Sequence, residues 1–221
     1  GPAAMNETGE TVIIVGAGLA GICVACYLAK QGIPYLVVEK SSRVGGVWSR
    51  LDFPGIRCDT EILNYSYSFN PLRASTSLVT GEAISRYLRA TADKFGIVDN
   101  IRFGTRVIAA DYSSEDHHWR LTTSRGRFRA RFLINTNGYF EDQPYLPKFP
   151  GNECYTGAIS HLFDTNRHTD FDGKQVVLVG SGASAISAAP ALAAGCRELT
   201  LLQRSPSWIC EDDNRIGWFT N

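Results

Sequence analysis

The sequence lacks an excess of charge of either sign, a long apolar run and a regular cysteine pattern. Among 221 residues, 22 lysines and arginines balance 22 aspartates and glutamates, so the formal net charge is zero. A neutral chain has no net field to attract nucleic acid or an anionic membrane surface. No apolar run approaches the ~18 residues of a membrane-spanning helix. We therefore expect a globular protein with neither a nucleic-acid partner nor a membrane span.

The N-terminus also lacks a secretion signal. Residues 1–4 resemble the scar left by protease cleavage ahead of Met5, and residues 6–10 are acidic and poor in apolar side chains. The cysteines are irregularly spaced: Cys23, Cys26, Cys58, Cys154, Cys196 and Cys210. Cys23 and Cys26 form a C-x-x-C, but no second cysteine or histidine pair stands at zinc-ligand spacing. These features predict a cytoplasmic protein with reduced thiols and no metal site.

What is present is a strand, a glycine-rich turn, a helix and a second strand within residues 11–39. In the turn, Gly16 permits the tight bend, Gly18 lets a pyrophosphate approach the backbone, and Gly21 lets the helix pack on the strand. Glu39 ends the second predicted strand 18 residues after Gly21. A carboxylate at that place can accept hydrogen bonds from both ribose hydroxyls of an adenosine. The unit therefore predicts a dinucleotide site.

A second unit of the same kind follows at residues 176–202, with its turn in residues 180–185. Where an acidic residue would follow its second strand, the chain has Gln203 and Arg204. An arginine there suits a 2′-phosphate, which favours NADPH over NADH, although a solvated surface arginine is the alternative. Two units mean two dinucleotides, or one dinucleotide and one relic. The economical pair is FAD in the first and NADPH in the second.

Between the two units, the pattern predicts a helix over residues 80–95 and strands over residues 101–135. Arginines at positions 125, 127, 129 and 131 alternate with other residues, which is typical of a half-exposed strand. Prolines in residues 141–151 predict a stiff linker. We expect an N-terminal tail over residues 1–10, an FAD domain over 11–140, a linker over 141–172 and a partial NADP domain over 173–221.

Several short motifs together resemble those of the class B flavin monooxygenases of the Baeyer–Villiger type. They are the glutamate and G-G-x-W of residues 39–48, the P-G-x-x-x-D of residues 54–59, the tyrosine–serine run of residues 65–69, the domain crossover at residues 135–139, and the NADPH-binding strand end of residues 202–208. The resemblance covers about residues 11–209 and corresponds to the N-terminal half of the family. It implies a truncated α/β, Rossmann-like flavoprotein fold that binds two dinucleotides, with an FAD domain and a partial NADPH domain.

The resemblance also implies the site residues. For the cofactors they are Gly16, Gly18, Leu19, Ala20, Gly21, Glu39, Lys40, Gly46, Val47, Trp48, Asp59, Tyr65, Val107, Asn137 and Gly138 for FAD, and Gly180, Ser181, Gly182, Ala183, Ser184, Gln203 and Arg204 for NADPH. The catalytic candidates are Asp59, Arg57 and His161. Asp59 corresponds to a carboxylate that orients a catalytic arginine, which another chain or Arg57 would have to supply, or which is absent. From its local sequence, the alternative role for Asp59 is that of a turn-capping aspartate. His161 corresponds to a histidine that couples the two domains.

Two departures from the family bear on activity. In residues 155–166, Gly157 and His161 match the family fingerprint, but Thr165 and Asn166 replace its aromatic and final residues. Family members are also about twice this length. We therefore keep several alternatives: one half of a split or heterodimeric enzyme or a homo-oligomer, a fragment, and a short relative that is a non-redox catalyst, such as a cyclase, or a partner subunit. A flavin disulfide reductase is disfavoured because Cys58 alone follows the G-G-x-W.

Overall fold

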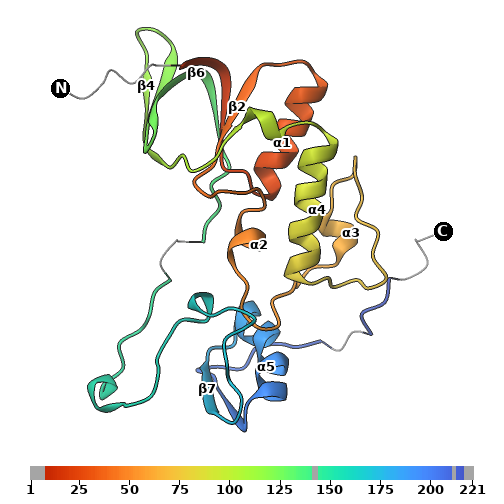
Figure 1. Cartoon of the computed structure of the whole chain (residues 1–221), viewed down its shortest axis with the longest axis vertical. Coiled ribbons are helices and arrows are strands. Elements are labelled where there is room, and N and C mark those ends of the chain that lie inside the picture. The colour runs from red at the N-terminus through yellow and green to blue at the C-terminus, as the bar shows by residue number, and fades with distance from the viewer. Residues whose placement is uncertain (1–7, 141–143, 211–212, 217–221) are drawn as a thin grey trace. The chain divides into compact units, whose positions relative to one another are not determined.

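The computed structural model describes residues 8–140, 144–210 and 213–216 (Figure 1). It divides the chain into two compact units. The first contains the described residues up to Arg50 together with Ile84–Tyr139, and the second contains Leu51–Ala83 together with the described residues from Phe140 onward. Each unit carries one of the two predicted glycine turns. The predicted boundary at residue 140 separates the turns, but residues 51–83 cluster with the second unit.

The first unit is a six-stranded sheet with strand order β3-β2-β1-β6-β5-β4. Strands β3, β2, β1 and β6 run parallel, and β6, β5 and β4 form an antiparallel meander. Its elements are β1 (Thr8–Val15), α1 (Leu19–Lys30), β2 (Tyr35–Val38), α2 (Val47–Arg50), most of α4 (Gly81–Lys94), η1 (Val98–Asn100), β3 (Ile101–Arg102), β4 (Val107–Ser113), β5 (His118–Thr123) and β6 (Gly126–Asn135). The parallel strands, joined through helices, confirm the predicted Rossmann-like arrangement.

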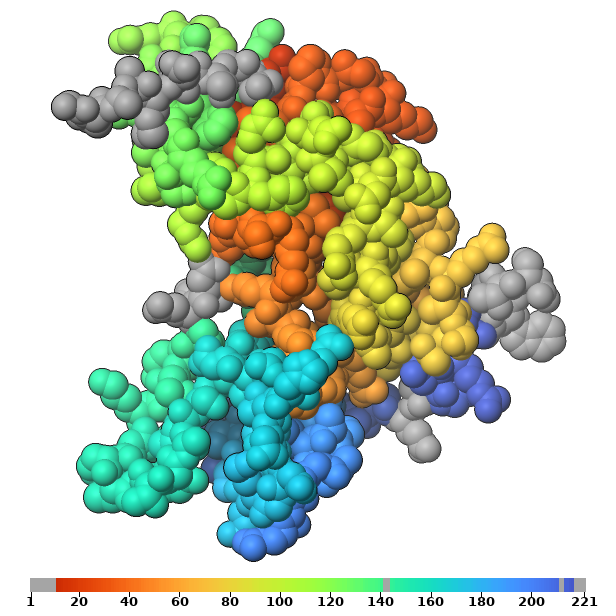
Figure 2. Space-filling view, in the orientation of Figure 1, coloured from red at the N-terminus to blue at the C-terminus, as the bar shows by residue number. Residues whose placement is uncertain are grey.

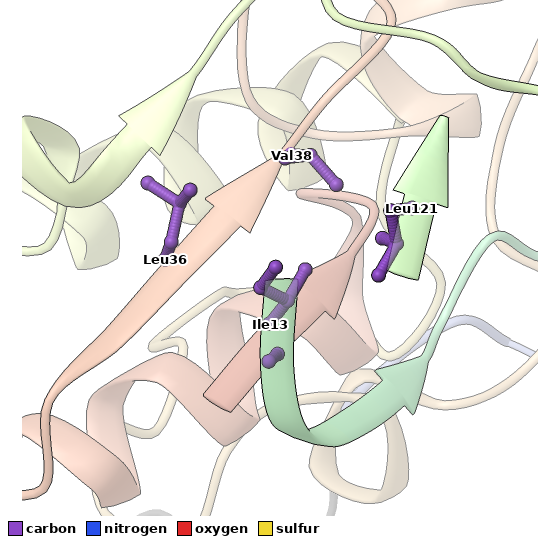
Figure 3. Close-up of a cluster of buried hydrophobic side chains, with 5 residues drawn as sticks. Ile13, Leu36, Val38 and Leu121 are labelled. Atoms are coloured by element: carbon purple, nitrogen blue, oxygen red, sulfur yellow. The ribbon is translucent and has the colours of Figure 1, made fainter. Parts of the chain in front are cut away.

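The core of this sheet is built from apolar residues on four strands. Ile13 of β1, Leu36 and Val38 of β2, Leu121 of β5 and Ala130 of β6 are all buried in one cluster (Figure 3). On α4, residues at helical spacing are buried as the periodicity predicts: Ile84, Tyr87, Leu88 and Thr91. Burial of these side chains supplies the main stabilisation of the unit. It also fixes the end of β1, from which the first turn departs.

The arginine alternation of β6 is confirmed with two differences. Arg125 precedes the strand, and Arg129 is an ion-pair partner of Asp116 at 3.2 Å rather than a free solvated group. Arg120 binds the same carboxylate oxygen at 2.9 Å. The hydrogen bond from Arg120 holds the pKa of Asp116 well below its usual range. The cluster braces the turn between β4 and β5, so these arginines have a structural role there.

The second unit contains a small parallel pair of strands. Strand β7 (Gln175–Val179) pairs with β8 (Glu198–Leu202), and α5 (Ala183–Gly195) connects them. Parallel sheets are normally covered on both faces. Here the side chains that point away from α5 are exposed: Val177 at 61%, Val179 at 52% and Leu202 at 55%. Among the described residues, nothing covers this apolar face of the pair.

The rest of the second unit contains little regular structure. Its short helices are α3 (Ile62–Tyr65), η2 (Asn152–Cys154) and η3 (Leu162–Asp164). The backbone N–H of Leu78 and the hydroxyl of Ser77 both donate to Oδ1 of Asn214, at 2.6 and 3.2 Å. Asn214 therefore joins two parts of this unit that are far apart in sequence. The segment from residue 144 to residue 160 exposes Tyr145 and Tyr155 and forms part of the surface drawn in teal in Figure 2.

The expected absences concern membranes and metals. In the part of the chain that the structure describes, no helix combines the length and apolarity that a membrane span requires. The same residues contain no group of three or more histidine, cysteine or acidic side chains that could hold a metal ion. All six cysteines are free. Burial raises the pKa of the Cys26 thiol, which lies on α1 in the C-x-x-C, to about 11.

Candidate dinucleotide sites

The first glycine turn connects β1 to α1 in a conformation that depends on its glycines. Gly16 has a φ of +101°, and a Cβ on Gly21 would overlap the carbonyl oxygen of Gly16. The glycine pattern of residues 16–21 predicts that the helix begins after Gly21, but α1 begins at Leu19, so Gly21 lies inside its first turn. The close approach brings the N-terminus of α1 against the end of β1. A pyrophosphate placed there would meet backbone N–H groups rather than side chains.

The N-terminus of α1 is built to accept an anion. Its N-cap residue, Gly18, has no side chain to bind the first N–H groups, and the first turn contains no acidic residue. The positive end of the helix dipole is therefore not compensated by the helix itself. Leu19 and Ala20, both predicted contacts, occupy the first two helical positions. Their backbone, and not their side-chain chemistry, is what a phosphate would contact.

Glu39 follows β2 at the place where the sequence predicts ribose recognition. The residue is buried and only 5% exposed. One oxygen accepts a hydrogen bond from the N–H of Ala17 at 2.6 Å, and the other accepts one from Ser41 at 2.7 Å. A carboxylate offers about four acceptor positions. The two backbone bonds therefore fix its orientation and leave capacity for two hydroxyl donors. This arrangement fits the adenosine ribose of a dinucleotide.

The G-G-x-W segment covers the same turn. The N–H of Gly45 donates to the carbonyl of Ala17 at 2.9 Å, and a Cβ on Gly46 would lie 2.9 Å from the Cα of Gly18. The backbones of the two glycine segments are thus in close contact, which explains why both are glycine-rich. Val47 and Trp48 follow in α2 and are half-buried, while Lys40 is exposed.

Thr136 is a functional candidate that the sequence reasoning missed. Its hydroxyl lies 2.7 Å from the carbonyl oxygen of Val15 and 3.1 Å from that of Gly16, and it thereby braces the turn from the end of β6. The sequence did contain a signal for Thr136, because the carboxyl ends of adjacent parallel strands meet at one edge of a sheet. The predicted contacts Asn137 and Gly138 follow at the same edge and are exposed. Val107 instead packs against the core cluster, so its side chain has a structural role.

The second glycine turn has the same design with different details. Gly180 has a φ of +129°, and its N–H donates to the carbonyl of Leu202 at 2.9 Å, as Gly16 donates to Val38 at 2.8 Å. Gly182 is the N-cap of α5 and has no capping side chain. The third position is a buried Ala185 rather than a glycine. A Cβ on Gly180 would lie 4.0 Å from that of Ala185, so this turn is more open than the first.

The residues after β8 lie beside the second turn. Gln203 is half-buried and Arg204 is exposed. Ser207 donates its hydroxyl to the carbonyl of Ser181 at 2.7 Å, and Ser181 donates to the carbonyl of Ser205 at 3.3 Å. The predicted residues Ala183 and Ser184 form the first turn of α5, which has no acidic side chain. The structure therefore brings the predicted NADPH residues together around one helix N-terminus.

The predicted catalytic residues belong to the second unit. Asp59 and Arg57 are exposed, and no ion pair or hydrogen bond found for the described residues joins them. The backbone between them is fixed, because Cys58 donates to Val79 at 2.9 Å and Arg57 forms a bridge with Thr80. Tyr65 ends α3 and is half-buried. Arg57 is thus not the partner that holds the Asp59 carboxylate in this structure.

His161 has a defined position within the fingerprint-like segment. Its Nδ1 accepts a hydrogen bond from the N–H of Phe163 at 3.1 Å, which caps η3. Its ring meets the ring of Phe163 edge-on, with 4.7 Å between the ring centroids. The ring of Phe163 in turn stacks on that of Phe53, with 5.9 Å between the centroids. Thr165 stands where the family fingerprint has an aromatic residue, and Phe163 lies two positions earlier. The hydrogen bond at Nδ1 requires that nitrogen to be unprotonated.

Comparisons with known proteins agree with the two-turn architecture. The family model described as "Pyridine nucleotide-disulphide oxidoreductase" matches residues 13–218. The FAD-containing monooxygenase EthA of Mycobacterium tuberculosis is 36% identical over 214 residues, which is 93% of this chain and 44% of that protein. The probable FAD-binding monooxygenase AlmA of Acinetobacter baylyi is 33% identical over 90% of this chain and 42% of its own length.

Solved structures give the same result. An oxidized steroid monooxygenase bound to NADP superimposes with a TM-score of 0.80 at 37% identity, over 90% of this chain and 39% of that one. A cyclohexanone monooxygenase mutant from Rhodococcus bound to NADP+ superimposes with a TM-score of 0.86 at 27% identity, over 95% and 41%. The resemblance predicted from sequence is confirmed. The chain spans about two fifths of the length of these proteins.

Proposed function

Because the chain belongs to the family of pyridine nucleotide-disulphide oxidoreductases, we propose that it binds FAD and NADPH and serves a flavin-dependent monooxygenase reaction. The reaction is oxygen insertion of the Baeyer–Villiger type, or oxygenation of a heteroatom or carbon, on a small organic molecule such as a natural product, in the cytoplasm. One observation carries this proposal. The chain has two similar turns, and one is followed by buried Glu39 and the other by exposed Arg204.

The first turn fits FAD. Its glycines leave the backbone open to a pyrophosphate, the N-terminus of α1 attracts the negative charge, and the oriented Glu39 carboxylate has room for two ribose hydroxyls. Both hydrogen bonds on Glu39 come from the backbone of the turn region. Any ligand held by this carboxylate is therefore held in register with the turn.

The second turn fits NADPH. Arg204 follows β8 without a nearby carboxylate in sequence, and α5 presents an uncapped N-terminus. A guanidinium binds a phosphate through a pair of hydrogen bonds, which a hydroxyl at the same place cannot match. The relatives named above include two structures with NADP bound. The proposed preference for NADPH over NADH rests on Arg204.

When bound, the flavin supplies the chemistry that accepts hydride from NADPH and activates dioxygen. The chain's own residues bind and orient the two dinucleotides. We assign Asp59 the role of orienting an arginine from a further polypeptide, since Arg57 does not pair with it. His161 holds the segment that joins the two dinucleotide units in sequence.

We further propose that a second polypeptide, or another copy of this chain, completes the assembly. The exposed valines and leucine of the β7–β8 pair support this, since parallel sheets are normally covered on both faces. Such a partner would add strands or a helix over Val177, Val179 and Leu202.

The first test is the visible absorption spectrum of the desalted 221-residue chain after incubation with FAD. The proposal expects a retained flavin band that is bleached by NADPH under anaerobic conditions and restored by air. The Glu39→Ala variant is the control for the site. A chain that retains FAD but is not bleached by NADPH would contradict the redox role and leave the FAD site standing.

A second candidate function is favoured by the altered fingerprint. The fingerprint has Thr165 and Asn166 at its last two positions. In this second candidate, the chain is a monooxygenase-like protein that has lost the redox cycle and acts as a non-redox catalyst, such as a cyclase, or as a partner subunit. This candidate predicts flavin binding without NADPH-dependent bleaching, or no flavin binding. The same spectrum therefore distinguishes the two candidates.

A further inference from the structure

The two turns share a hydrogen bond that the glycine pattern does not encode. In each turn, the carbonyl oxygen of the residue between the first two glycines accepts a hydrogen bond from the segment after the second strand. In the first turn the donor is the N–H of Gly45, which lies 2.9 Å from the oxygen of Ala17. In the second turn the donor is the hydroxyl of Ser207, which lies 2.7 Å from the oxygen of Ser181. A side chain in the second unit thus replaces a backbone group in the first.

The bond at Ser207 is one of two hydrogen bonds that join Ser181 of the turn to the loop of residues 203–207. We call this pair of hydrogen bonds the clasp. The hydroxyl of Ser181 donates in return to the carbonyl of Ser205 at 3.3 Å. Upstream of Arg204, the carbonyl of Leu202 accepts from the N–H of Gly180 at 2.9 Å. The backbone of Arg204 is therefore bound to the same turn on both sides. Pro206 lies inside the clasp, and its ring further restricts the loop.

The clasp also orients a peptide group of the turn. A trans peptide is planar, so its C=O and N–H point in opposite directions. Because Ser207 holds the carbonyl of Ser181, the N–H of Gly182 is turned away from the Arg204 loop. Gly182 is the N-cap of α5, where a phosphate would bind. One hydroxyl thus sets the direction of a phosphate-binding N–H and the position of the loop that carries Arg204.

We propose that Ser207 is a positioning residue that determines the preference of the second site for NADPH over NADH. It acts through Arg204, by holding the loop of residues 203–207 at a fixed distance from the turn. This inference rests on the proposed assignment of the second turn to NADPH. Without the bond from Ser207, the loop that carries Arg204 is held at its N-terminal end. Its C-terminal end is held only by one exposed hydrogen bond at 3.3 Å. The 2′-phosphate contact weakens more than the contacts that NADP+ and NAD+ share.

The test is calorimetric titration of the full 221-residue chain with NADP+ and with NAD+. The readout is the dissociation constant for NAD+ divided by the dissociation constant for NADP+. A general loss of folded protein does not change this ratio. Ser207→Ala is expected to lower this ratio about threefold to tenfold, the range of one ordinary hydrogen bond. Ser207→Thr keeps the hydroxyl and is expected to restore the ratio. Ser114→Ala, at an exposed serine of the β4–β5 turn, is the matched control.

Arg204→Ala separates this inference from the proposed function. If Arg204→Ala abolishes the preference and Ser207→Ala leaves it intact, Ser207 has no such role and the NADPH assignment stands. Equal weakening of NADP+ and NAD+ by Ser207→Ala would also overturn the inference. A wild-type chain without any preference overturns both. If circular dichroism shows that Ser207→Ala does not fold, Ser181→Ala opens the other half of the clasp and is expected to lower the ratio in the same direction.

Discussion

The two dinucleotide turns are one design carried out in two ways. In the first, Gly21 sits so close to Gly16 that no side chain is possible, and the turn is held by the Glu39 carboxylate, by backbone donors and by the Thr136 hydroxyl. In the second, Ala185 stands in place of the third glycine, and serine hydroxyls hold the turn. The first turn is therefore tight and acidic at its ribose end. The second is more open, and its loop carries a cation.

The difference teaches which residues of such a turn can change. The parts common to both are the first glycine with positive φ, the bond from its N–H to the end of the second strand, and the glycine N-cap. Each common part satisfies a backbone requirement. The parts that differ surround the ribose and the loop after the second strand. We therefore expect ligand choice to depend on residues outside the glycine pattern.

The largest expected effect breaks the comparison at its third position. Gly21→Ala places a methyl group onto the carbonyl oxygen of Gly16, and the turn must distort. We expect a loss of more than about 3 kcal/mol in the free energy of unfolding, together with loss of FAD binding. The matched change Ala185→Gly is expected to cost about 1 kcal/mol, as for a glycine in a helix. Urea denaturation of both variants measures the difference, and equal effects would contradict the distinction drawn between the turns.

The next effect concerns the acidic end of the first turn. Glu39→Ala removes the acceptor for both ribose hydroxyls and also leaves the N–H groups of Ala17 and Ser41 without their partner. We expect FAD affinity to fall at least about a hundredfold. Glu39→Gln keeps one acceptor oxygen and is expected to lose less. Flavin fluorescence titration gives the values, and an unchanged affinity in Glu39→Ala would exclude Glu39 from the site.

The cationic loop of the second turn gives a smaller and more selective effect. Arg204→Ala is expected to weaken NADP+ binding by about tenfold or more while NAD+ binding changes little, because only the 2′-phosphate loses its partner. Arg197→Ala, at an exposed arginine just before β8, controls for the loss of positive charge. The measurement is a pair of titrations for each variant. Equal losses for both nucleotides would assign Arg204 to the shared part of the ligand.

A further effect concerns the pH dependence of stability and a thiol on the helix that follows the first turn. Helix α1 carries Cys26, whose pKa burial raises from its ordinary value of 9.0 to about 11, with a contribution from Cys23. The protonated thiol is thus favoured in the folded state, so its stabilisation is complete below about pH 9 and is lost as the pH rises through about 11. The expected loss is about 2 kcal/mol. Urea midpoints between pH 8 and pH 10.5 should fall less in Cys26→Ala than in the wild type, and parallel curves would contradict the assignment.

The sequence was sufficient for features that depend on near neighbours. Both turns, their flanking strands and helices, and the positions of Glu39 and Arg204 in sequence follow from local spacing. The structure has these elements in the predicted order, with α1 beginning at Leu19, before Gly21. Local spacing did not indicate Thr136, because it braces Gly16 from 120 positions away; the pairing of parallel strand ends at one sheet edge was the signal that pointed to it. The clasp at Ser207 depends on the path of a loop, for which periodicity has no signal. The grouping of residues 51–83 with the second unit depends on packing, which short motifs do not describe.

The bond between Asn214 and residues Ser77 and Leu78 has a consequence for the order in which the protein is made. The first unit contains no residue beyond Tyr139, so all of its residues are synthesised before the C-terminal part of the second unit. The segment 51–83 must wait for a side chain that emerges 136 positions after Leu78. At ordinary elongation rates this wait is roughly ten seconds. During this interval the N–H of Leu78 and the hydroxyl of Ser77 lack the acceptor that Asn214 gives them in the folded unit.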